Sequence, residues 1–438
     1  MSSPPDLLIL GAGAAGIAAA REAAARGLSC LVLEARGRAG GRAATDNATL
    51  GAPFDLGATW LHQANSNPLV PLAREAGFRL LNHDEHRAHR LRVGDRWAGP
   101  AEEAAFDAAY DRWLAAVRDA PAEPDRPVAA VAPRGGYWDA SIAAWEGPTI
   151  AATELHRIGV ADFLSNQLDP PNLLPEAGCG TLLAALAAPL PIRLGCPVEK
   201  LEWGAAGGVR ASGAWGSVSA RAAVVTLPVG VLAAGGLRFD PPLPVPVQEA
   251  IGGLPMGLLL KLGLRAAGED RLDLPPFCGL DRRVEEGERR MAFIAWPFGR
   301  DHLEGFAGGE LAWELERAGE GAAVAHALDE LTGLFGSRAR RAVSATGAAV
   351  SRWGSDPFAR GAYSYARPGA AAARRVLAEP LFGGRLVFAG EHCHPSLAGT
   401  LGGAWETGLA AARHVAAALR PGEGDGGSAG GSCYTAAR

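Results

Sequence analysis

Three glycines near the N-terminus are spaced as in a dinucleotide-binding turn. They follow the apolar run Asp6–Leu10 and precede an alanine-rich stretch. In such a turn the first glycine permits a tight bend, the second lets the backbone approach a pyrophosphate, and the third lets the helix pack closely on the strand. The free N–H groups at the helix N-terminus attract the phosphate charge. The candidate contacts in this turn are Gly11, Gly13, Ala14, Ala15 and Gly16.

An acidic residue stands where a dinucleotide needs one. Glu34 ends a second apolar run, Leu28–Leu33, and lies 18 residues past the third glycine. Its carboxylate can accept hydrogen bonds from both ribose hydroxyls and disfavours a 2′-phosphate, which argues against NADP. Strand, glycines, helix, strand and acid in this order are far more specific than the glycines alone. The alternative, a glycine-rich turn without a ligand, is therefore strongly disfavoured.

The residues after this acid favour FAD over NAD. Arg36, Arg38 and Arg42 follow it, together with the glycine pair Gly40-Gly41. An NAD-binding domain has no need of these groups. A cofactor whose pyrophosphate is covered, and whose ring is carried into a second domain, does need them.

The elements that must position these groups fall into two kinds of segment. Short apolar runs of the kind that form buried strands alternate with helical segments. The best predicted helix is 101–120, where five residues fall on one stripe that we expect to pack against a core: Phe106, Tyr110, Trp113, Leu114 and Val117. The predicted strands are 6–10, 28–33, 198–203, 207–211, 217–220, 222–226, 258–264, 291–296 and 386–390, and a last helix is expected over 402–419.

This alternation predicts two interleaved domains, because 438 residues exceed what one core usually organises. The expected fold class is α/β, with a discontinuous Rossmann-like FAD-binding domain and a substrate-binding domain of mixed sheet plus helices. The FAD-binding domain is expected over residues 1–75, 176–250 and 375–420, and the substrate-binding domain over 76–175 and 251–374. The Gly- and Ser-rich stretch 421–438 predicts a disordered tail.

Composition narrows the class of partner and the compartment. The net charge of −5 and the lack of basic runs do not indicate a surface that binds nucleic acid or an anionic membrane. The sequence has no apolar run long enough to span a bilayer and no visible export signal. The six cysteines are scattered, with no CxxC pair. These features predict a cytoplasmic protein, a monomer or a homodimer, without nucleic-acid or membrane partners.

Further blocks along the chain carry a family resemblance. They read E-A-R-G-R-A-G-G-R from Glu34, F-D-L-G-A-T-W-L-H from Phe54, W-G-S-D-P-F-A-R-G-A-Y from Trp353, and F-A-G-E-H with G-T-L-G-G-A from Phe388 to Ala404. Together with the glycine turn they resemble the flavin-containing amine oxidases, which include monoamine oxidases, polyamine oxidases and lysine-specific histone demethylases. The resemblance covers roughly residues 6 to 418 and is nearest the polyamine oxidase-like members.

The resemblance implies a set of cofactor contacts beyond the glycine turn. Trp353 belongs to a block that lies against the flavin in the family, Val198 would contact the adenine half through its backbone, and Glu391 the ribityl-pyrophosphate region. The full implied set adds Glu34, Arg36, Gly41, Arg42, Gly57, Ala58, Thr59, Gly390, Thr400 and Leu401. The cysteine that carries the flavin covalently in monoamine oxidases is Ala362 here, which predicts non-covalent FAD.

Lys261 is the candidate catalytic residue. It lies inside the apolar run Leu258–Leu264, where a lysine is costly to bury unless it is partnered. From the residues alone, an edge position with its amine reaching water is the better interpretation. The resemblance reverses this, because a lysine in this strand reaches the flavin N5 through a water in the family. The reaction it implies moves a hydride from the α-carbon of an amine to the flavin, gives an imine and then an aldehyde, and reduces O2 to H2O2.

The implied substrate contacts are Trp60, His62, Tyr363 and Thr400. Tyr363 matches one of the two tyrosines that flank the substrate in monoamine oxidases, and Thr400 takes the place of the other. His62 resembles a histidine that touches the substrate in several polyamine oxidases, although Gln63 replaces the glycine that usually follows. An equally favoured interpretation is a histidine that only hydrogen-bonds in the core.

Other polar clusters are expected to be unremarkable in function. Five carboxylates that could hold the distal cations of a polyamine are better interpreted as solvated surface groups: Asp139, Glu146, Glu154, Asp162 and Glu176. The run from His83 to His89 predicts a charged loop or an edge strand, because its spacing fits no standard zinc pattern. His392 and His394 lie within the flavin block, so we expect no metal at either cluster.

Two other functions remain open at this stage. One is a related flavin enzyme, such as an L-amino-acid oxidase or a desaturase-type enzyme, and the first of these would need an arginine for the substrate carboxylate. The other is a binding module that keeps FAD without turning over an amine. An amine oxidase that acts on a small-molecule amine and O2 is favoured, and the identity of the amine is left open.

Overall fold

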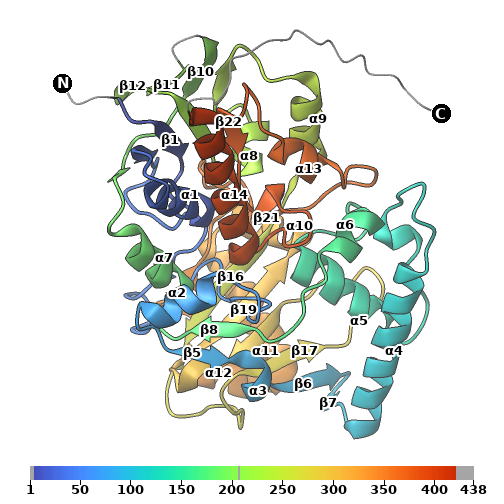
Figure 1. Ribbon diagram of the computed structural model, residues 1–438. Coiled ribbons are helices and arrows are strands. Elements are labelled where there is room, and N and C mark those ends of the chain that lie inside the picture. The colour runs from blue at the N-terminus through green and yellow to red at the C-terminus, as the bar shows by residue number, and fades with distance from the viewer. Residues whose placement is uncertain (1–3, 206–207, 421–438) are drawn as a thin grey trace.

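The computed structural model describes residues 4–205 and 208–420, so the tail predicted over 421–438 lies outside the described residues. Figure 1 shows the N-terminal segment (blue) and the C-terminal segment (red) side by side in one half of the molecule, with yellow strands in the other half. Segments far apart in the sequence therefore build each half. No described helix combines the length and the apolar character that crossing a bilayer requires.

A parallel five-stranded sheet forms the first half. Its order is β22 (Leu386–Phe388), β13 (Ala222–Val225), β1 (Leu7–Leu10), β2 (Cys30–Leu33) and β9 (Ile192–Arg193). Strand β1 is buried along its whole length, as its unbroken apolar run predicts for a strand covered on both faces. Leu7 of β1 lies opposite Ala222 of β13 and opposite Cys30 of β2, and both pairs are parallel. The carboxyl ends of these strands therefore lie at one edge of the sheet.

Helices α1 (Ala14–Ala25) and α14 (Leu401–Leu419) pack against each other beside this sheet (Figure 1). Their backbones come very close at Gly408, where an added Cβ would lie 2.1 Å from the carbonyl oxygen of Ala15. Gly16 is equally constrained, because its Cβ would lie 1.9 Å from the carbonyl oxygen of Gly11. The predicted role of Gly16 in close strand–helix packing therefore agrees with the geometry.

A seven-stranded mixed sheet forms the second half. Its order is β20 (Ala349–Val350), β16 (Leu259–Arg265), β19 (His302–Gly308), β18 (Ala292–Ala295), β17 (Cys278–Arg282), β6 (Ala88–Val93) and β7 (Arg96–Trp97). The pairs are antiparallel except for β17 with β6. Helices α10 (Gly309–Ala318), α11 (Glu320–Phe335) and α12 (Ala339–Ala342) share an apolar core with this sheet. The parallel sheet and the mixed sheet together confirm the predicted α/β class.

The helical segment between residues 100 and 165 consists of α4 (Pro100–Arg118), α5 (Asp139–Ala144), the π-helix η2 (Trp145–Ala151) and α6 (Val160–Ser165). Helix α4 matches the predicted helix 101–120 closely. Trp113 and Val117 are buried in its core cluster, and Phe106 and Leu114 pack against it. Tyr110 packs against the same cluster, as expected, and it also lines the main cavity.

The run from His83 to His89 matches the expected charged loop or edge strand in part. Residues His83–His86 form the short helix α3 rather than a loop. Ala88 and His89 begin β6, where they pair with β17 on one side. Strand β7 pairs only with Arg92 and Val93 of β6, so Ala88 and His89 lie at the edge of the sheet, as expected.

The remaining elements are short. The four-stranded sheet has the order β12 (Gly216–Ala220), β11 (Gly208–Gly213), β10 (Lys200–Ala205) and β14 (Arg238–Asp240). Three strand pairs are β3 (Thr45–Asp46) with β4 (Phe54–Asp55), β5 (Leu80–Asn82) with β8 (Leu173–Pro175), and β15 (Met256–Gly257) with β21 (Tyr363–Ser364). The other helices are α2 (Leu69–Glu75), α7 (Cys179–Ala187), α8 (Val229–Ala233), α9 (Val245–Gly253) and α13 (Ala373–Ala378), with 3-10 turns at Val128–Ala130, Pro297–Gly299, Gly336–Arg338 and Glu391–Cys393.

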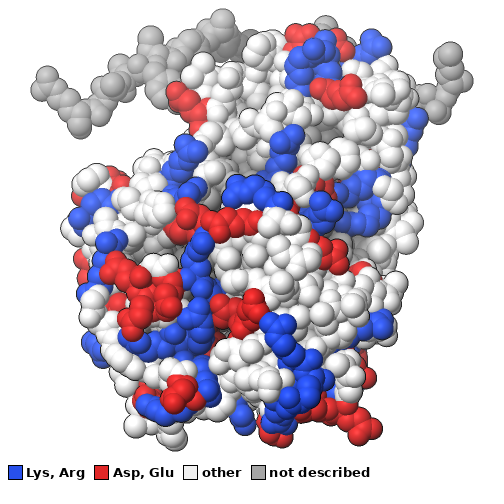
Figure 2. Space-filling model, turned by 180° about the vertical axis from the view of Figure 1, so that it is seen from behind, with Lys and Arg blue, Asp and Glu red and all other residues white. Residues whose placement is uncertain are grey.

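The parallel sheet draws all its strands from the segments predicted for FAD binding, and the seven-stranded sheet draws all of its strands from 76–175 and 251–374. The domain boundaries themselves stay a prediction. Figure 2 shows acidic and basic side chains interspersed on the face opposite the view of Figure 1. Exposed ion pairs, such as Arg338 with Asp270 at 2.8 Å, contribute little to stability.

The contact of α1 with α14 leads to a stability prediction. Gly408→Ala places a methyl group against the Ala15 carbonyl, so we expect the free energy of unfolding to fall by about 1–3 kcal/mol. Gly333→Ala is the matched control, because Gly333 lies in α11 with no atom within 4 Å of its added Cβ. The control should gain up to about 1 kcal/mol from helix propensity. Urea denaturation measures the free energy of unfolding of both variants. Equal values would contradict the prediction, because they would mean that α1 and α14 can move apart to fit the methyl group at no cost in stability.

Candidate active site

One large cavity connects the glycine turn to the helical segment. Its volume is about 840 Å³, and its wall runs from Gly11 at the end of β1, past Lys261 in β16, to Glu146 in the π-helix. A cavity of this size accommodates a large cofactor together with a small molecule. Of the residues predicted to contact cofactor or substrate, all but Gly16 lie on its wall. Gly16 lies behind the turn.

The glycine turn leaves room for a pyrophosphate. Helix α1 begins at Ala14, directly after Gly13, so its first N–H groups lie at the cavity. Gly41 approaches from the opposite side, where an added Cβ would lie 3.2 Å from the Cα of Gly13. Gly11 has a φ of +106°, a conformation that only glycine adopts readily. Side chains at Gly11 and Gly41 would collide with Thr226 and Gly13, so the glycines allow these backbones to lie close together at the cavity, as a dinucleotide-binding turn requires.

Glu34 is buried at the end of β2, as predicted. Its carboxylate accepts hydrogen bonds from the backbone N–H of Ala12 at 2.7 Å and of Arg36 at 2.8 Å. A carboxylate oxygen can accept more than one hydrogen bond, so both oxygens keep capacity for ribose hydroxyls. The Arg36 side chain pairs with Asp356 and lies over the ring of Trp353. This brings the Glu34 and Trp353 blocks together on one wall.

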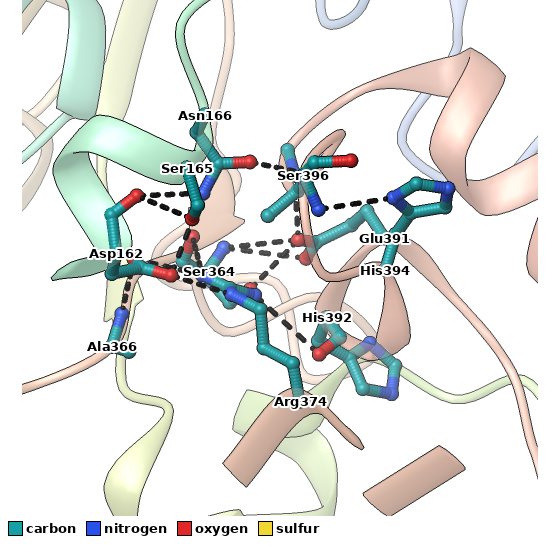
Figure 3. Close-up of polar contacts among 12 residues, drawn as sticks. Asp162, Ser165, Asn166, Ser364, Ala366, Arg374, Glu391, His392, His394 and Ser396 are labelled. Atoms are coloured by element: carbon teal, nitrogen blue, oxygen red, sulfur yellow. Dashed lines mark hydrogen bonds and ion pairs between the residues drawn. The ribbon is translucent and has the colours of Figure 1, made fainter. Parts of the chain in front are cut away.

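Glu391 accepts hydrogen bonds from three separate segments of the chain, and Figure 3 shows the one that contains Ser364. It accepts from Arg42 Nη1 at 2.9 Å, from Ser364 Oγ at 2.7 Å and from the backbone N–H of Gly399 at 3.0 Å. Burial alone would raise the pKa of the Glu391 carboxyl, but Arg42, the other nearby cations and the Ser364 hydroxyl lower it to about 2. Glu391 is therefore a buried anion at neutral pH. The same Arg42 nitrogen donates to the carbonyl oxygen of Ala362 at 2.8 Å.

Asp162 corrects one prediction, because it is buried rather than solvated. Its two oxygens accept from Arg374 at 2.7 and 3.0 Å, and Oδ2 also accepts from the backbone N–H of Ala366 at 2.7 Å. Arg374 in turn donates to Ser364 Oγ at 2.9 Å (Figure 3). This chain of contacts ties α6, on the cavity wall, to Glu391. The burial of Asp162 could not be predicted from the sequence, because its partner Arg374 lies in no motif.

Glu146 corrects a second prediction in the same way. It lies in the π-helix, is buried, and lines the cavity instead of facing solvent. The Tyr110 hydroxyl donates a hydrogen bond to its carboxylate. Burial raises the pKa of the Glu146 carboxyl, although the Tyr110 hydroxyl opposes this. π-helical turns occur often at functional sites. The other three carboxylates considered, Asp139, Glu154 and Glu176, are half-buried and lie outside the cavity wall.

Lys261 is buried in β16, which lies between β20 and β19. The edge position that its residue type alone suggested is therefore wrong. Its ammonium donates to the carbonyl oxygen of Asp55 at 2.6 Å, to that of Gly57 at 3.4 Å and to the Thr59 hydroxyl. The carboxylate of Glu304 lies 4.0 Å away. These partners allow the lysine to stay buried next to the cavity, and its catalytic role stays a prediction.

The aromatic end of the cavity contains the predicted substrate residues. Trp60 and His62 stack with a centroid distance of 6.1 Å and an interplanar angle of 25°. The Tyr363 hydroxyl donates to the carbonyl oxygen of Ile150 at 2.8 Å, and burial raises its pKa, so it stays protonated. The Thr400 hydroxyl accepts from Gly403 N–H at 2.9 Å as the cap of α14 and donates to Leu397. Thr400 thus serves first to begin a helix, and its contact with a substrate stays a prediction.

Several wall residues at this end were not found from the sequence. They come from the segment 110–172 and are Tyr110, Trp145, Phe163, Asn166, Gln167 and Asn172. No local motif marks them, and their aromatic residues fit core packing equally well. The remaining predicted contacts, Gly57, Ala58, Val198, Gly390 and Leu401, all lie on the wall. In the described part of the chain, no three His, Cys, Asp or Glu side chains gather as a metal site would require.

The Glu391 contacts predict a pH-dependent loss of stability in Glu391→Gln. The folded-state pKa of about 2 lies below the ordinary value of 4.5, so the carboxylate stabilises the fold above pH 4.5 and this contribution is lost as the pH falls toward 2. The variant should therefore lose most stability at neutral pH and progressively less in acid. Urea denaturation between pH 7 and pH 3 measures this trend. Glu406→Gln, at a half-exposed carboxylate paired with His394, is the control, and an equal loss at every pH would contradict the buried anion.

Comparisons with known proteins agree with this geometry. The family model for flavin containing amine oxidoreductases matches residues 14–123 and 139–416. Polyamine oxidase 4 of Oryza sativa subsp. japonica is 29% identical over 94% of this chain and 88% of its own length. Lysine-specific histone demethylase 1 homolog 1 of the same plant is 28% identical over 95% of this chain but only 53% of its own length. This chain thus spans about half of that demethylase homologue.

Solved structures show the same fold. A double mutant of putrescine oxidase, made in a redesign of its cofactor binding, superimposes with a TM-score of 0.76. The match covers 94% of this chain and 99% of the other at 19% sequence identity. The match of the family model to most of the chain confirms the resemblance seen in the motifs, and with it the FAD cofactor. This chain belongs to the family of flavin containing amine oxidoreductases.

Proposed function

We propose that this chain is an FAD-dependent amine oxidase that prefers amines carrying a second positive charge. The observation that supports this most directly is the single cavity in which the dinucleotide turn at one end faces a buried carboxylate, Glu146, at the other. The relatives named polyamine oxidase and the neighbour named putrescine oxidase are consistent with it. We place the protein in the cytoplasm, as a monomer or homodimer, as part of the same proposal.

The cofactor would be held along one side of the cavity. The glycine turn and Glu34 would take the pyrophosphate and the ribose, and Arg42 with Glu391 would border the middle of the cofactor. When bound, FAD supplies a two-electron acceptor that takes a hydride equivalent from the carbon next to the amine nitrogen and passes the electrons to O2, which becomes H2O2. The resulting imine hydrolyses to an aldehyde.

The side chains at the aromatic end orient the amine and keep water away. Trp60 and Tyr363 present aromatic surface, which attracts an alkylammonium and shields the reacting carbon. His62 adds a polar group beside Trp60. Glu146 can pair with a second ammonium of the substrate. That pairing would offset the free-energy cost of burying the Glu146 carboxylate.

The amino-acid oxidase alternative is less well supported. A substrate carboxylate needs an unpaired arginine, and the described arginines on the wall are Arg36, Arg42 and Arg360. The first two are paired with Asp356 and Glu391, which leaves the exposed Arg360 as the wall arginine without an ion pair among the described residues. A carboxylate substrate would also be repelled by Glu146. The same experiment separates this alternative from the proposal.

The decisive experiment mixes the purified protein anaerobically with monoamines, diamines, polyamines and amino acids, and follows the visible absorption band of the oxidised flavin. Bleaching by amines, fastest with diamines or polyamines, is the expected result. Bleaching by amino acids alone would establish the alternative. If none of these compounds bleaches the flavin, the proposal is overturned, and the protein is better interpreted as a module that binds FAD without oxidising an amine.

Lys261→Met tests the candidate catalytic residue. We expect the flavin to remain bound and turnover with O2 to slow by about a hundredfold, the range in which a positioned proton donor or acceptor contributes. Lys200→Met is the control, because Lys200 lies in β10 and pairs with the exposed carboxylates of Glu202 and Asp240. Turnover of Lys261→Met equal to that of the parent protein would remove Lys261 from the mechanism.

Glu146→Gln tests the second cation. We expect kcat/KM for a diamine to fall by roughly tenfold or more, and that for a monoamine of the same length to change little, because only the diamine loses a charge-assisted hydrogen bond. Glu154→Gln is the control, since its carboxylate caps the Glu310 backbone outside the cavity wall. A similar loss for both substrates would assign Glu146 to cavity shape rather than to cation binding.

Ala362 leads to a simple test of cofactor attachment. It lies on the cavity wall, its carbonyl accepts from Arg42, and its methyl group offers no atom for a covalent bond to the flavin. Precipitation of the protein with acid should therefore release the yellow colour into the supernatant. A yellow pellet after washing in denaturant would contradict non-covalent binding.

A further inference from the structure

A buried carboxylate that no motif marks lies beside Lys261. It belongs to Glu304 in β19, a strand that is buried at every residue. In the antiparallel pair of β16 with β19, Lys261 lies opposite Phe306, and Gly263 lies opposite Glu304. Side chains two residues apart on a strand point to the same face. Lys261 and Glu304 are therefore diagonal neighbours on one face of the sheet, and the glycine leaves the place opposite the carboxylate without a side chain.

The hydrogen bonds of the Lys261 amine fit an ammonium. Its Nζ donates to three oxygens, which are the backbone carbonyls of Asp55 and Gly57 and the Thr59 hydroxyl. The Thr59 hydroxyl gives its own hydrogen to the Gly57 carbonyl oxygen at 3.2 Å, so it can only accept from Nζ. An ammonium has three hydrogens for these three acceptors. A neutral amine has two, and its lone pair would face an oxygen.

A buried ammonium also needs a counter-charge. Among the described residues, Glu304 has the only carboxylate within 4.0 Å of Nζ. The Lys261 side chain is 3% exposed and that of Glu304 10%, so solvent screens the pair only weakly. Burial alone would raise the pKa of the Glu304 carboxyl, but Lys261 and His302 hold it below its ordinary value. Glu304 is therefore an anion at neutral pH.

The titratable groups on the other side of Lys261 do not replace this anion. The Asp55 carboxylate accepts from the Thr45 hydroxyl at 2.6 Å and from the backbone N–H of Cys179 at 2.9 Å, where α7 begins. Burial raises the pKa of Asp55, although Lys261 and these donors oppose this. Burial also raises the pKa of the Cys179 thiol, which therefore stays neutral. The Asp55 side chain thus serves α7, and only its carbonyl oxygen contacts the ammonium.

The groups on the far side of Glu304 lie outside the cavity wall. His302 Nε2 is 3.7 Å from Glu304 Oε1, which is too long for a hydrogen bond. Arg300 donates to the backbone carbonyl oxygens of Pro53 and Glu176. Burial lowers the pKa of the nearby His83, whose ring is therefore neutral at neutral pH. Of the charged partners of Glu304, Lys261 alone lines the cavity.

We propose that Glu304 is a positioning residue that keeps Lys261 in its ammonium form, so that Lys261 acts as a fixed cation while O2 is reduced and not as a base toward the amine. The identity of that reaction rests on the proposed function. The hydride taken from the amine carries two electrons and one proton, and solvent supplies the second proton that turns O2 into H2O2. Negative charge develops on oxygen as the electrons arrive, and a cation already in place stabilises it.

The step with O2 can be measured without any amine. The bound flavin is reduced with stoichiometric dithionite and mixed with O2 at a series of pH values, and the return of its visible band gives the rate constant. If the ammonium is required, this rate constant falls with rising pH, once Lys261 loses its proton. In Glu304→Gln we expect the fall to begin at least about one pH unit lower than in the parent protein, because an anion at this distance favours the charged amine by that much or more.

PH profiles that superimpose in the parent protein and Glu304→Gln would overturn the proposal. The result does not depend on what the protein oxidises. If no amine bleaches the flavin but the profile shifts as expected, the proposed function fails and the role of Glu304 stands.

Two further variants separate charge from shape. Glu330→Gln is the matched control, because the Glu330 side chain is 11% exposed and pairs with Arg282 at 3.0 Å outside the cavity wall. It should keep the pH profile of the parent protein. Glu304→Asp keeps a carboxylate and should move the profile back toward that of the parent. A profile equal to that of Glu304→Gln would contradict an effect of charge.

The double variant Lys261→Met/Glu304→Gln tests whether Glu304 acts through Lys261. It also covers the case in which Lys261→Met alone fails to fold around an unpaired buried carboxylate, since it removes both charges together. We expect its rate constant with O2 to be independent of pH in the range where the parent changes, and no lower than that of Lys261→Met. Losses that add in the double variant would contradict the proposal.

Discussion

The buried contact of Arg42 with Glu391 is the interaction on which the rest of the site depends. It joins the segment that follows the dinucleotide turn to the C-terminal block, which are 349 residues apart in the chain. Ser364 adds β21 to the same carboxylate, and Arg374 extends the network to Asp162 in α6. A buried carboxylate is tolerable only when its charge is balanced and its oxygens are bonded. The charge of Glu391 therefore constrains the positions of all these segments at once.

The cavity has two ends with different physical chemistry. At the first end, glycines and the first backbone N–H groups of α1 line the cavity, together with Glu34, the acid predicted to meet the ribose of a dinucleotide. At the second end, aromatic rings surround polar groups that are oriented from behind. Tyr110 orients Glu146, and Asn172 orients His62. A substrate amine would thus meet polar groups already fixed in place, which lowers the ordering cost of binding.

The elements near the turn could be predicted because their chemistry is local. A strand covered on both faces needs an unbroken apolar run, and the turn after β1 needs a glycine at φ +106°. Glu34 must end the next strand. These requirements act over a few residues and leave a pattern that can be read directly. The long blocks at Trp353 and Glu391 could be assigned through their resemblance to the family, since each carries several of its motif residues in a short stretch.

Burial of the polar residues could not be predicted in this way. Asp162 and Glu146 look like surface carboxylates in the sequence, and both are buried because Arg374, 212 residues away, and Tyr110, 36 residues away, come to meet them. The residue type of Lys261 alone likewise favours an edge position, whereas β20 and β19 lie on either side of its strand. The partner of a charged group depends on how distant segments pack, and no local spacing records that.

The amino-acid sequence by itself determined the class of fold, the FAD-binding turn and the family, because each rests on residues whose types are constrained by their immediate neighbours. Only the tertiary structure decided which carboxylates face the cavity, that His62 meets Asn172, and how the lysine in β16 is partnered. The physical reason is that desolvation makes a buried polar group depend on its hydrogen-bond partners, and here those partners come from segments that meet only in the folded chain.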